Sequence, residues 1–196
     1  WSSSAASDVY KRQVLNDLIE FLVQRIVSHL EEISLSKELI KALYSSDEFS
    51  QKRILNIVDL KNRVKSIVNF KEKETFFEIQ KVITRVSKLA NSSNLSTEVL
   101  SIGDYVNTKL FEKDCELKVF EFIKELEKLY SKGSCDYLKL LNLFEININT
   151  IEDLFDNEKG VLVMTEDMKV RNNRLNLLSL IRNYSLKIAD FTLLNS

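Results

Sequence analysis

Proline is absent from this chain of 196 residues, and glycine occurs only three times, at Gly103, Gly133 and Gly160. A soluble protein of this length would carry roughly ten prolines and about fourteen glycines. Because proline breaks helix interiors and glycine weakens them, the scarcity of both favours long helices. The dipeptides Asn-Gly and Asp-Gly, which the commonest hairpin turns require, are also missing. The sequence therefore predicts an all-α helical bundle without a sheet.

Metal ligands and reactive groups are equally scarce. The chain has two cysteines, Cys115 and Cys135, no C-x-x-C pair, and a single histidine, His29. A structural zinc site needs about four such ligands, so we expect reduced thiols and no metal. Neither common glycine-rich phosphate loop occurs, and the carboxylates are scattered over polar helix faces. We expect no catalytic residue and no bound cofactor in this chain.

The chain also lacks targeting features. No apolar run approaches the ~18 residues of a membrane span, and no secretory leader is visible, so we expect no membrane partner. Residues 1–13 are rich in Ser and Ala and lack helical periodicity. We expect them to form a non-native or disordered lead, with the helical domain over residues 14–196. Residues 14–70 belong either to that domain or to a preceding helical segment.

Apolar residues three and four positions apart predict a series of amphipathic helices. The expected helices cover residues 14–33, 36–43, 47–70, 75–90, 115–130, 136–143 and 166–191, the last being the longest. Capping-box spacing marks further helix starts at Ser45 with Glu48, Thr75 with Glu78, and Asn149 with Glu152.

Charge is segregated along the chain although the net charge is only −1. Residues 52–88 are rich in Lys and Arg, whereas residues 112–158 lean acidic. Ordinary solvated helix faces explain either block. A basic surface that binds phosphates is the alternative, because such binding needs local and not net positive charge.

The final predicted helix carries arginines in two different settings. Placed at 100° intervals, its apolar residues form one stripe, made of Val170, Leu177, Ile181, Tyr184 and Ile188. Arg171 and Arg182 lie together on a neighbouring face, roughly 16 Å apart. They are either RNA contacts or ordinary solvated charges.

Arg174 falls at the margin of the apolar stripe instead. Its guanidinium should be at least partly buried, and it then needs a carboxylate or carbonyl partner. Asp156, Asp167 and Asp190 are the candidates, and the sequence does not separate them. We interpret Arg174, Asp156 and Asp167 as structural residues.

Three runs near the C-terminus carry a family signature: Asp-Leu-Phe-Asp at 153–156, Val-Leu-Val-Met-Thr-Glu-Asp at 161–167, and Val-Arg-Asn-Asn-Arg-Leu-Asn-Leu-Leu at 170–178. This order resembles the end of glycyl-tRNA synthetase β subunits, where it closes an anticodon-binding domain of the DALR type. Looser matches occur at residues 20–25, 85–89 and 106–116. Leu154 stands where the family has an aromatic residue, and Thr84 where it has a basic one.

The resemblance implies a function as well as a fold. Such β subunits grip tRNA(Gly) within an α2β2 enzyme that attaches glycine with ATP and Mg, while the α subunit carries the ATP and glycine site. It implies a cytoplasmic enzyme, or one of the plastid stroma. We predict these tRNA contacts in this chain: Lys81, Arg85, Lys88, Arg171, Asn172 and Arg182.

Two other functions compete with this interpretation. One is a non-catalytic helical module that binds a protein partner through its apolar and acidic faces. The other is the anticodon-binding domain of an arginyl-tRNA synthetase, since that family shares the DALR-type domain.

Overall fold

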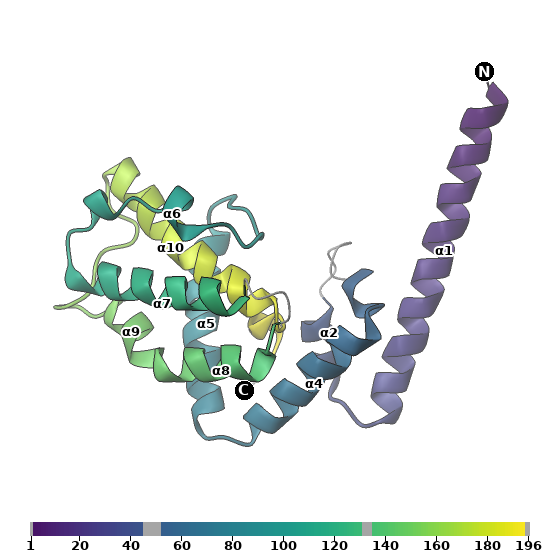
Figure 1. Ribbon diagram of the computed structural model, residues 1–196, viewed down its shortest axis with the longest axis horizontal. Helices are drawn as coiled ribbons and strands as arrows, with labels where there is room; N and C mark the ends of the chain where they lie inside the picture. The colour runs from purple at the N-terminus through teal and green to yellow at the C-terminus, as the bar shows by residue number, and fades with distance from the viewer. Residues whose placement is uncertain (1, 45–51, 131–134, 195–196) are drawn as a thin grey trace.

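The computed structural model describes residues 2–44, 52–130 and 135–194. Within these ranges every regular element is a helix and no strand occurs, so the predicted all-α class is confirmed. Figure 1 shows the helix α1 (Ser2–Glu32) projecting away from a bundle that the later helices form. The helices of the bundle are α2 (Lys37–Leu43), α4 (Ile57–Lys71), α5 (Thr75–Asn91), α6 (Ile102–Tyr105), α7 (Asp114–Tyr130), α8 (Tyr137–Ile146), α9 (Ile148–Asp153) and α10 (Met168–Leu186). Two 3-10 helices complete it, η1 (Thr108–Leu110) and η2 (Phe191–Leu193).

Helix α10 is the centre of the bundle. It packs against α5, α6, α7 and η1 (Figure 1). Every side chain from Leu177 to Ser185 is buried, whether apolar or polar. The predicted apolar stripe of this helix is buried as expected. The opposite side is buried too, because neighbouring elements cover α10 on several sides.

Helix α5 has one face in the core and one in solvent. Its apolar residues Phe76, Ile79, Val82, Ile83 and Val86 are all buried. They lie at the three-and-four spacing that places side chains on one side of a helix. This face packs on α10 and η2. The remaining side of α5 is open to solvent, which makes it a surface element.

Two predicted helix starts differ in the structure. Residues 52–54 are helical, but the chain breaks before α4 and the expected helix over 47–70 is not continuous. The break occurs because the Asn56 side chain accepts a hydrogen bond from the Asp59 N–H and caps α4. Ser45 and Glu48 lie outside the described residues. Asn149 lies inside α9, whose N-cap is Asn147.

Other helix boundaries also differ from the prediction. Thr75 lies inside α5 and donates its hydroxyl to Glu145 instead of capping the helix. Helix α10 ends at Leu186 rather than near residue 191, because Asp190 caps the separate turn η2. Its 19 residues are fewer than the 31 of α1, so the last helix is not the longest.

The N-terminal residues, which the sequence predicted to be a non-native or disordered lead, are helical in the structure. Helix α1 begins at Ser2, because Ser and Ala are compatible with helix and no glycine or proline interrupts the segment. All side chains from Ala6 to Leu18 are exposed, so backbone hydrogen bonds rather than packing define this part. Further along, Val23 and Leu30 join the core.

A tight loop connects α9 to α10. The Gly160 N–H donates to the Asp156 carbonyl at 3.0 Å, and the Val161 N–H donates to the Leu154 carbonyl at 3.0 Å. The Asp156 carboxylate accepts the N–H groups of residues 158 and 159, both at 2.8 Å. Asp156 therefore shapes its own loop.

Gly160 provides a test of this loop. A Cβ at Gly160 would lie 2.6 Å from the Asp156 nitrogen and the Leu154 carbonyl oxygen, which are backbone atoms that cannot swing away. We expect Gly160→Ala to lower the free energy of unfolding by about 1–3 kcal/mol in urea titrations. Gly103→Ala is the matched control, because a Cβ at Gly103 meets nothing within 4 Å. Equal stability of the two variants would contradict the close approach of Gly160 to these backbone atoms.

Candidate nucleic-acid interface

Arg174 is a buried structural residue that joins α10 to α7. Its Nε donates to Glu116 at 2.9 Å, its Nη2 to Glu112 at 2.6 Å, and its Nη1 to the Leu162 carbonyl at 3.1 Å. Burial lowers the pKa of Arg174, but the hydrogen bonds to Glu116 and Glu112 outweigh burial and raise it overall. Glu116 is itself fully buried and accepts the N–H groups of Glu112 and Lys113. The charges of Arg174 and Glu116 therefore depend on each other.

The prediction that Asp156, Asp167 or Asp190 is the partner of Arg174 is wrong. Asp167 caps α10 by accepting the N–H groups of Lys169 and Val170. Asp190 caps η2 by accepting the Thr192 N–H, and Asp156 holds the loop before α10. All three carboxylates bind the backbone of their own segment. The true partners lie about sixty residues away, on α7 and just before it, where no local spacing could have identified them.

Replacing Arg174 tests the buried pair. We expect Arg174→Ala to cost about 3–5 kcal/mol of unfolding free energy, because Glu116 would stay buried without its cation. Lys169→Ala, at an exposed position near the start of the same helix, should change stability by less than about 0.5 kcal/mol. The measurement is a chemical-denaturation titration. A midpoint for Arg174→Ala equal to that of the native chain would refute the pairing.

Arg182 does not reach the surface, so its predicted phosphate contact is wrong. Its side chain is only 3% exposed. It donates to Asn91 at 2.8 Å, to Asn183 at 3.0 Å and to the Ser96 carbonyl at 2.7 Å. Burial lowers the pKa of this guanidinium. The segment after α5 covers this side of α10, and Arg182 fastens it there.

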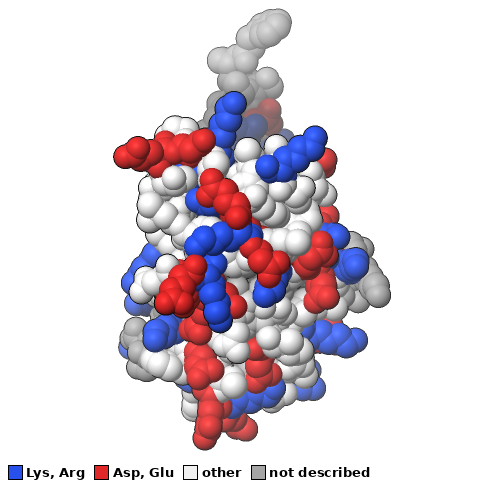
Figure 2. All heavy atoms as spheres, turned by 90° about the vertical axis from the view of Figure 1, so that its left-hand side faces the viewer, with Lys and Arg blue, Asp and Glu red and all other residues white. Residues whose placement is uncertain are grey.

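Arg171 and Asn172 lie at the start of α10 in a mixed electrostatic setting. Asn172 is exposed, whereas Arg171 is half-buried and donates to the Thr165 carbonyl at 2.6 Å. Figure 2 views the side of the molecule that carries α6, α9 and the start of α10. Lys and Arg alternate there with Asp and Glu, so this side has no uniformly basic patch among the described residues.

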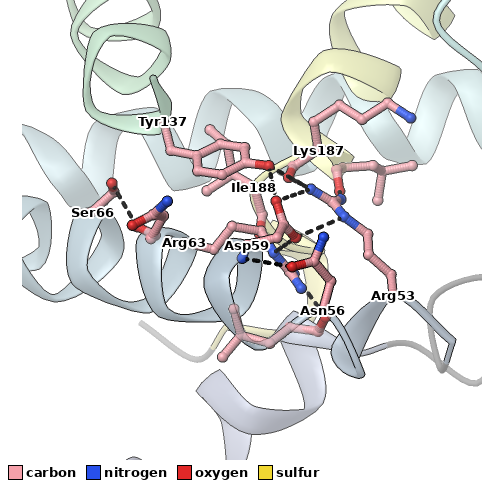
Figure 3. Close-up of polar contacts among 11 residues, drawn as sticks. Arg53, Asn56, Asp59, Arg63, Ser66, Tyr137, Lys187 and Ile188 are labelled. Atoms are coloured by element: carbon pink, nitrogen blue, oxygen red, sulfur yellow. Dashed lines mark hydrogen bonds and ion pairs between the residues drawn. The ribbon is translucent and has the colours of Figure 1, made fainter. Parts of the chain in front are cut away.

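Two arginines from the basic stretch 52–88 point inward (Figure 3). Arg63 is 1% exposed and donates to Asp59 at 2.9 Å and to the Leu43 carbonyl at 3.0 Å. Arg53 donates to Asp59 at 3.1 Å, to the Tyr137 hydroxyl at 2.8 Å and to the Lys187 carbonyl at 2.6 Å. The Tyr137 hydroxyl also donates to Asp59. The Asp59 cluster (Arg53, Asp59, Arg63 and Tyr137) thus ties α4 to α8 and to the end of α10.

The charge of Asp59 should make stability depend on pH. Burial raises the pKa of Asp59, but the hydrogen bond from Tyr137 and the charges of Arg53 and Arg63 lower it overall, below its ordinary value of 3.8. A lowered pKa gives stability that is present above pH 3.8 and lost as the pH falls through the folded value. We expect Asp59→Asn to destabilise the chain at pH 7 by about 1.5–3 kcal/mol, and the deficit to shrink below pH 3.8.

Urea titrations of both proteins from pH 7 downward measure that deficit. Asp104→Asn, at an exposed position on α6, is the control and should leave stability at neutral pH unchanged. A deficit that stays constant with pH would exclude an ionised Asp59 from this role.

Helix α5 carries basic side chains on its solvent-facing side. Phe77, Lys81, Arg85 and Lys88 are all exposed and lie within roughly 80° of the helix circumference. We call these four residues the α5 stripe. Within the described ranges, none of its three cations forms an ion pair with an acidic side chain. Positive charge on this helix face is therefore available to a ligand.

Arg85 has an aromatic support that the sequence did not reveal. Its guanidinium carbon lies over the ring of Phe155, 4.3 Å from the ring centre. Phe155 follows α9 and is half-buried. Phe77 was also missed, although placing α5 at 100° intervals shows it on the face of Lys81 and Lys88. The contact between Arg85 and Phe155 depends on tertiary packing and has no such local signal.

The described residues provide few groups that could bind a metal ion or act as a nucleophile. No three His, Cys, Asp or Glu side chains among them come together in a way that could hold a metal ion. Burial raises the pKa of Cys135 to about 11 and also raises the pKa of Cys115. Both thiols are thus protonated near neutral pH. In the part of the chain that the structure describes, no helix is both long and apolar enough to span a membrane.

Comparison with known proteins finds sequence similarity to one kind of protein subunit. No family model matches the chain. It is similar to the glycine–tRNA ligase β subunit of Picosynechococcus sp., with 32% identity over 185 residues and 92% of this chain. The subunits of Acaryochloris marina and Trichodesmium erythraeum are each 30% identical, over 90% and 91% of the chain. The chain spans about a quarter of the length of these relatives.

Proposed function

Since this chain belongs to the glycine–tRNA ligase β subunit family, we propose that it binds tRNA(Gly) for the ATP-dependent attachment of glycine. The chain would supply affinity for the tRNA rather than a catalytic centre. ATP with Mg and the glycine site would belong to the α subunit of an α2β2 enzyme, in the cytoplasm or the plastid stroma.

The α5 stripe is the observation that carries this proposal. The net charge of −1 excludes bulk attraction as the source of RNA binding, so local charge must provide it. Arg53, Arg63, Arg174 and Arg182 are used inside the fold. The three cations of the stripe remain on one helix face without acidic partners among the described residues. Phosphate oxygens are suitable ligands for such a row of cations.

Arg171 and Asn172 stay predicted tRNA contacts, but we expect them to contribute less to the affinity for tRNA than the α5 stripe. The side of the molecule that carries the start of α10 shows interleaved acids and bases (Figure 2), so a polyanion gains little from that side as a whole. The Asn173 side chain accepts a hydrogen bond from the N–H of residue 107, and the Asn176 side chain donates one to the carbonyl of residue 105, so both side chains are used inside the fold. We therefore assign the main phosphate contacts to the α5 stripe.

A role in protein–protein contact is the second candidate, and α1 supports it. Leu15, Leu18, Phe21 and Leu22 are 41–58% exposed on this helix. An apolar groove of about 660 Å³ lies between α1 and α4. Exposed apolar surface of this kind is typical of sites that bind another protein surface. It lies on a different element from the α5 stripe, so the two roles are compatible.

Salt dependence tests the phosphate contacts. We expect log–log plots of tRNA(Gly) affinity against salt to lose about two to three units of slope in the triple variant Lys81→Ala, Arg85→Ala, Lys88→Ala, because each lost contact removes roughly 0.7–0.9 unit. Fluorescence anisotropy with labelled tRNA measures the slope.

The matched control removes three exposed lysines from other elements, Lys109, Lys118 and Lys139. It changes the net charge by the same amount and should alter the slope far less. Equal slopes for the two triple variants would exclude the α5 stripe as the phosphate-binding surface.

A further inference from the structure

The groove between α1 and α4 has an apolar lining that the described fold leaves open. Helix α1 packs on α2, and Figure 1 shows it standing apart from α4. The apolar residues of this α1–α4 groove are Leu22, Ile26, Leu30 and Ile33 on one wall and Ile57, Leu60 and Val64 on the other. Ile33 and Ile57 are 52% and 54% exposed. Apolar side chains gathered around an open groove are typical of a site that another protein surface covers.

The walls of the α1–α4 groove favour a helix as the occupant. On each wall the apolar residues follow one another at intervals of three or four positions, so they form a row along one side of a helix. Such rows pack against the matching row of a further helix. An amphipathic helix can therefore lay its apolar face between the two walls.

The charges beside the groove indicate what the polar flanks of that helix carry. Arg25 of α1 and Lys61 of α4 border the groove from opposite sides, and both side chains are exposed. Among the described residues, neither forms an ion pair. Glu32 is the one acidic residue of the lining, and it already lies 3.6 Å from the ring nitrogen of His29. Charge complementarity thus favours an occupant with acidic flanks.

A second copy of the chain does not match these charges. Two copies that met face to face through the groove would place the same surface on both sides of the contact. Arg25 and Lys61 of one copy would then approach the same cations of the other copy. Like charges across a contact reduce affinity, so this pairing is unfavourable.

The length of the relatives points to a different source for the helix. The chain matches 25–26% of the three subunits named above, so about three-quarters of each lies outside the matching part. A segment of the same polypeptide can meet the groove at an effective concentration of about millimolar. A separate protein usually needs an interface of about 1,000 Å² or more. A narrow groove therefore suits a covalently linked helix better than a free partner.

We propose that the α1–α4 groove holds an amphipathic helix with acidic flanks, which belongs to the same β subunit but lies outside residues 1–196. This contact fixes the bundle to the rest of the subunit through α1. The inference rests on the protein-contact role proposed above and not on tRNA binding, and it adds the identity and the chemistry of the partner.

Thiol labelling measures whether the groove is covered. The variant Ile57→Cys places a thiol on the groove wall, and Leu117→Cys, at a position on α7 that is 46% exposed, is the matched control. Each is prepared in this chain and in the complete β subunit, and mass spectrometry of the peptides gives the rate of reaction with N-ethylmaleimide. Thermal melts verify that all variants fold.

We expect the thiol at position 57 to react at least about tenfold more slowly in the complete subunit than in this chain, because a covered site reacts only when it opens. The thiol at position 117 should change by less than about twofold. Equal rates at position 57 in the two proteins would overturn the proposal. Slowing in this chain that grows with its concentration would assign the groove to a second copy, and would overturn it as well.

Charge reversal tests the chemistry of the partner. In the complete subunit, Arg25→Glu with Lys61→Glu should raise the labelling rate at position 57 about tenfold, because the acidic flanks are then repelled. Lys109→Glu with Lys139→Glu makes the same change in net charge at exposed positions outside the groove and should leave the rate unaltered. Protection that survives the reversal at Arg25 and Lys61 would refute an acidic partner.

The tRNA measurement on the same proteins separates this proposal from the proposed function. The reversal at Arg25 and Lys61 leaves the α5 stripe intact. Failure of the native chain to bind tRNA would overturn the proposed function, whereas protection of position 57 would still support the helix in the groove. A gene that encodes nothing beyond residues 1–196 would overturn the groove proposal alone.

Discussion

The burial of α10 is the constraint on which the structure depends. A polar group taken out of water must find a hydrogen-bond partner, and α10 buries arginine and asparagine side chains along most of its length. Their partners are side chains and carbonyls of segments that lie far away in the sequence. Arg174 holds Glu116 on α7, Arg182 holds the segment after α5, and Asn173 holds Asn107 before η1. One helix thus fixes the positions of three separate loops and helix ends.

This use of arginine inside the fold determines what remains outside. Several guanidinium groups that a count of charges would assign to a basic surface serve instead as internal connectors, in α10 and in the Asp59 cluster. The α5 stripe carries cations that form no ion pair among the described residues, on a helix whose other side borders the core. A chain of nearly zero net charge can in this way present a cationic strip to a polyanion.

Local pattern was enough to predict part of this arrangement. The scarcity of proline and glycine predicted the helical class, and the spacing of Phe76, Ile79 and Ile83 on α5 predicted a buried face, which the structure confirms. Sequence could not identify Glu116 as the partner of Arg174, because 58 positions separate them. The sequence also predicted Arg182 at the surface, because placing residues at 100° intervals assumes that one side of a helix meets solvent.

The buried and the exposed side chains of α5 are under different physical constraints. The side chains of its inner face are committed to packing, and a change there is felt across the bundle. The outer side chains end in water, where most replacements have little effect on folding. Divergence among related chains can therefore alter the exposed surface of α5 residue by residue, while the architecture is inherited without alteration.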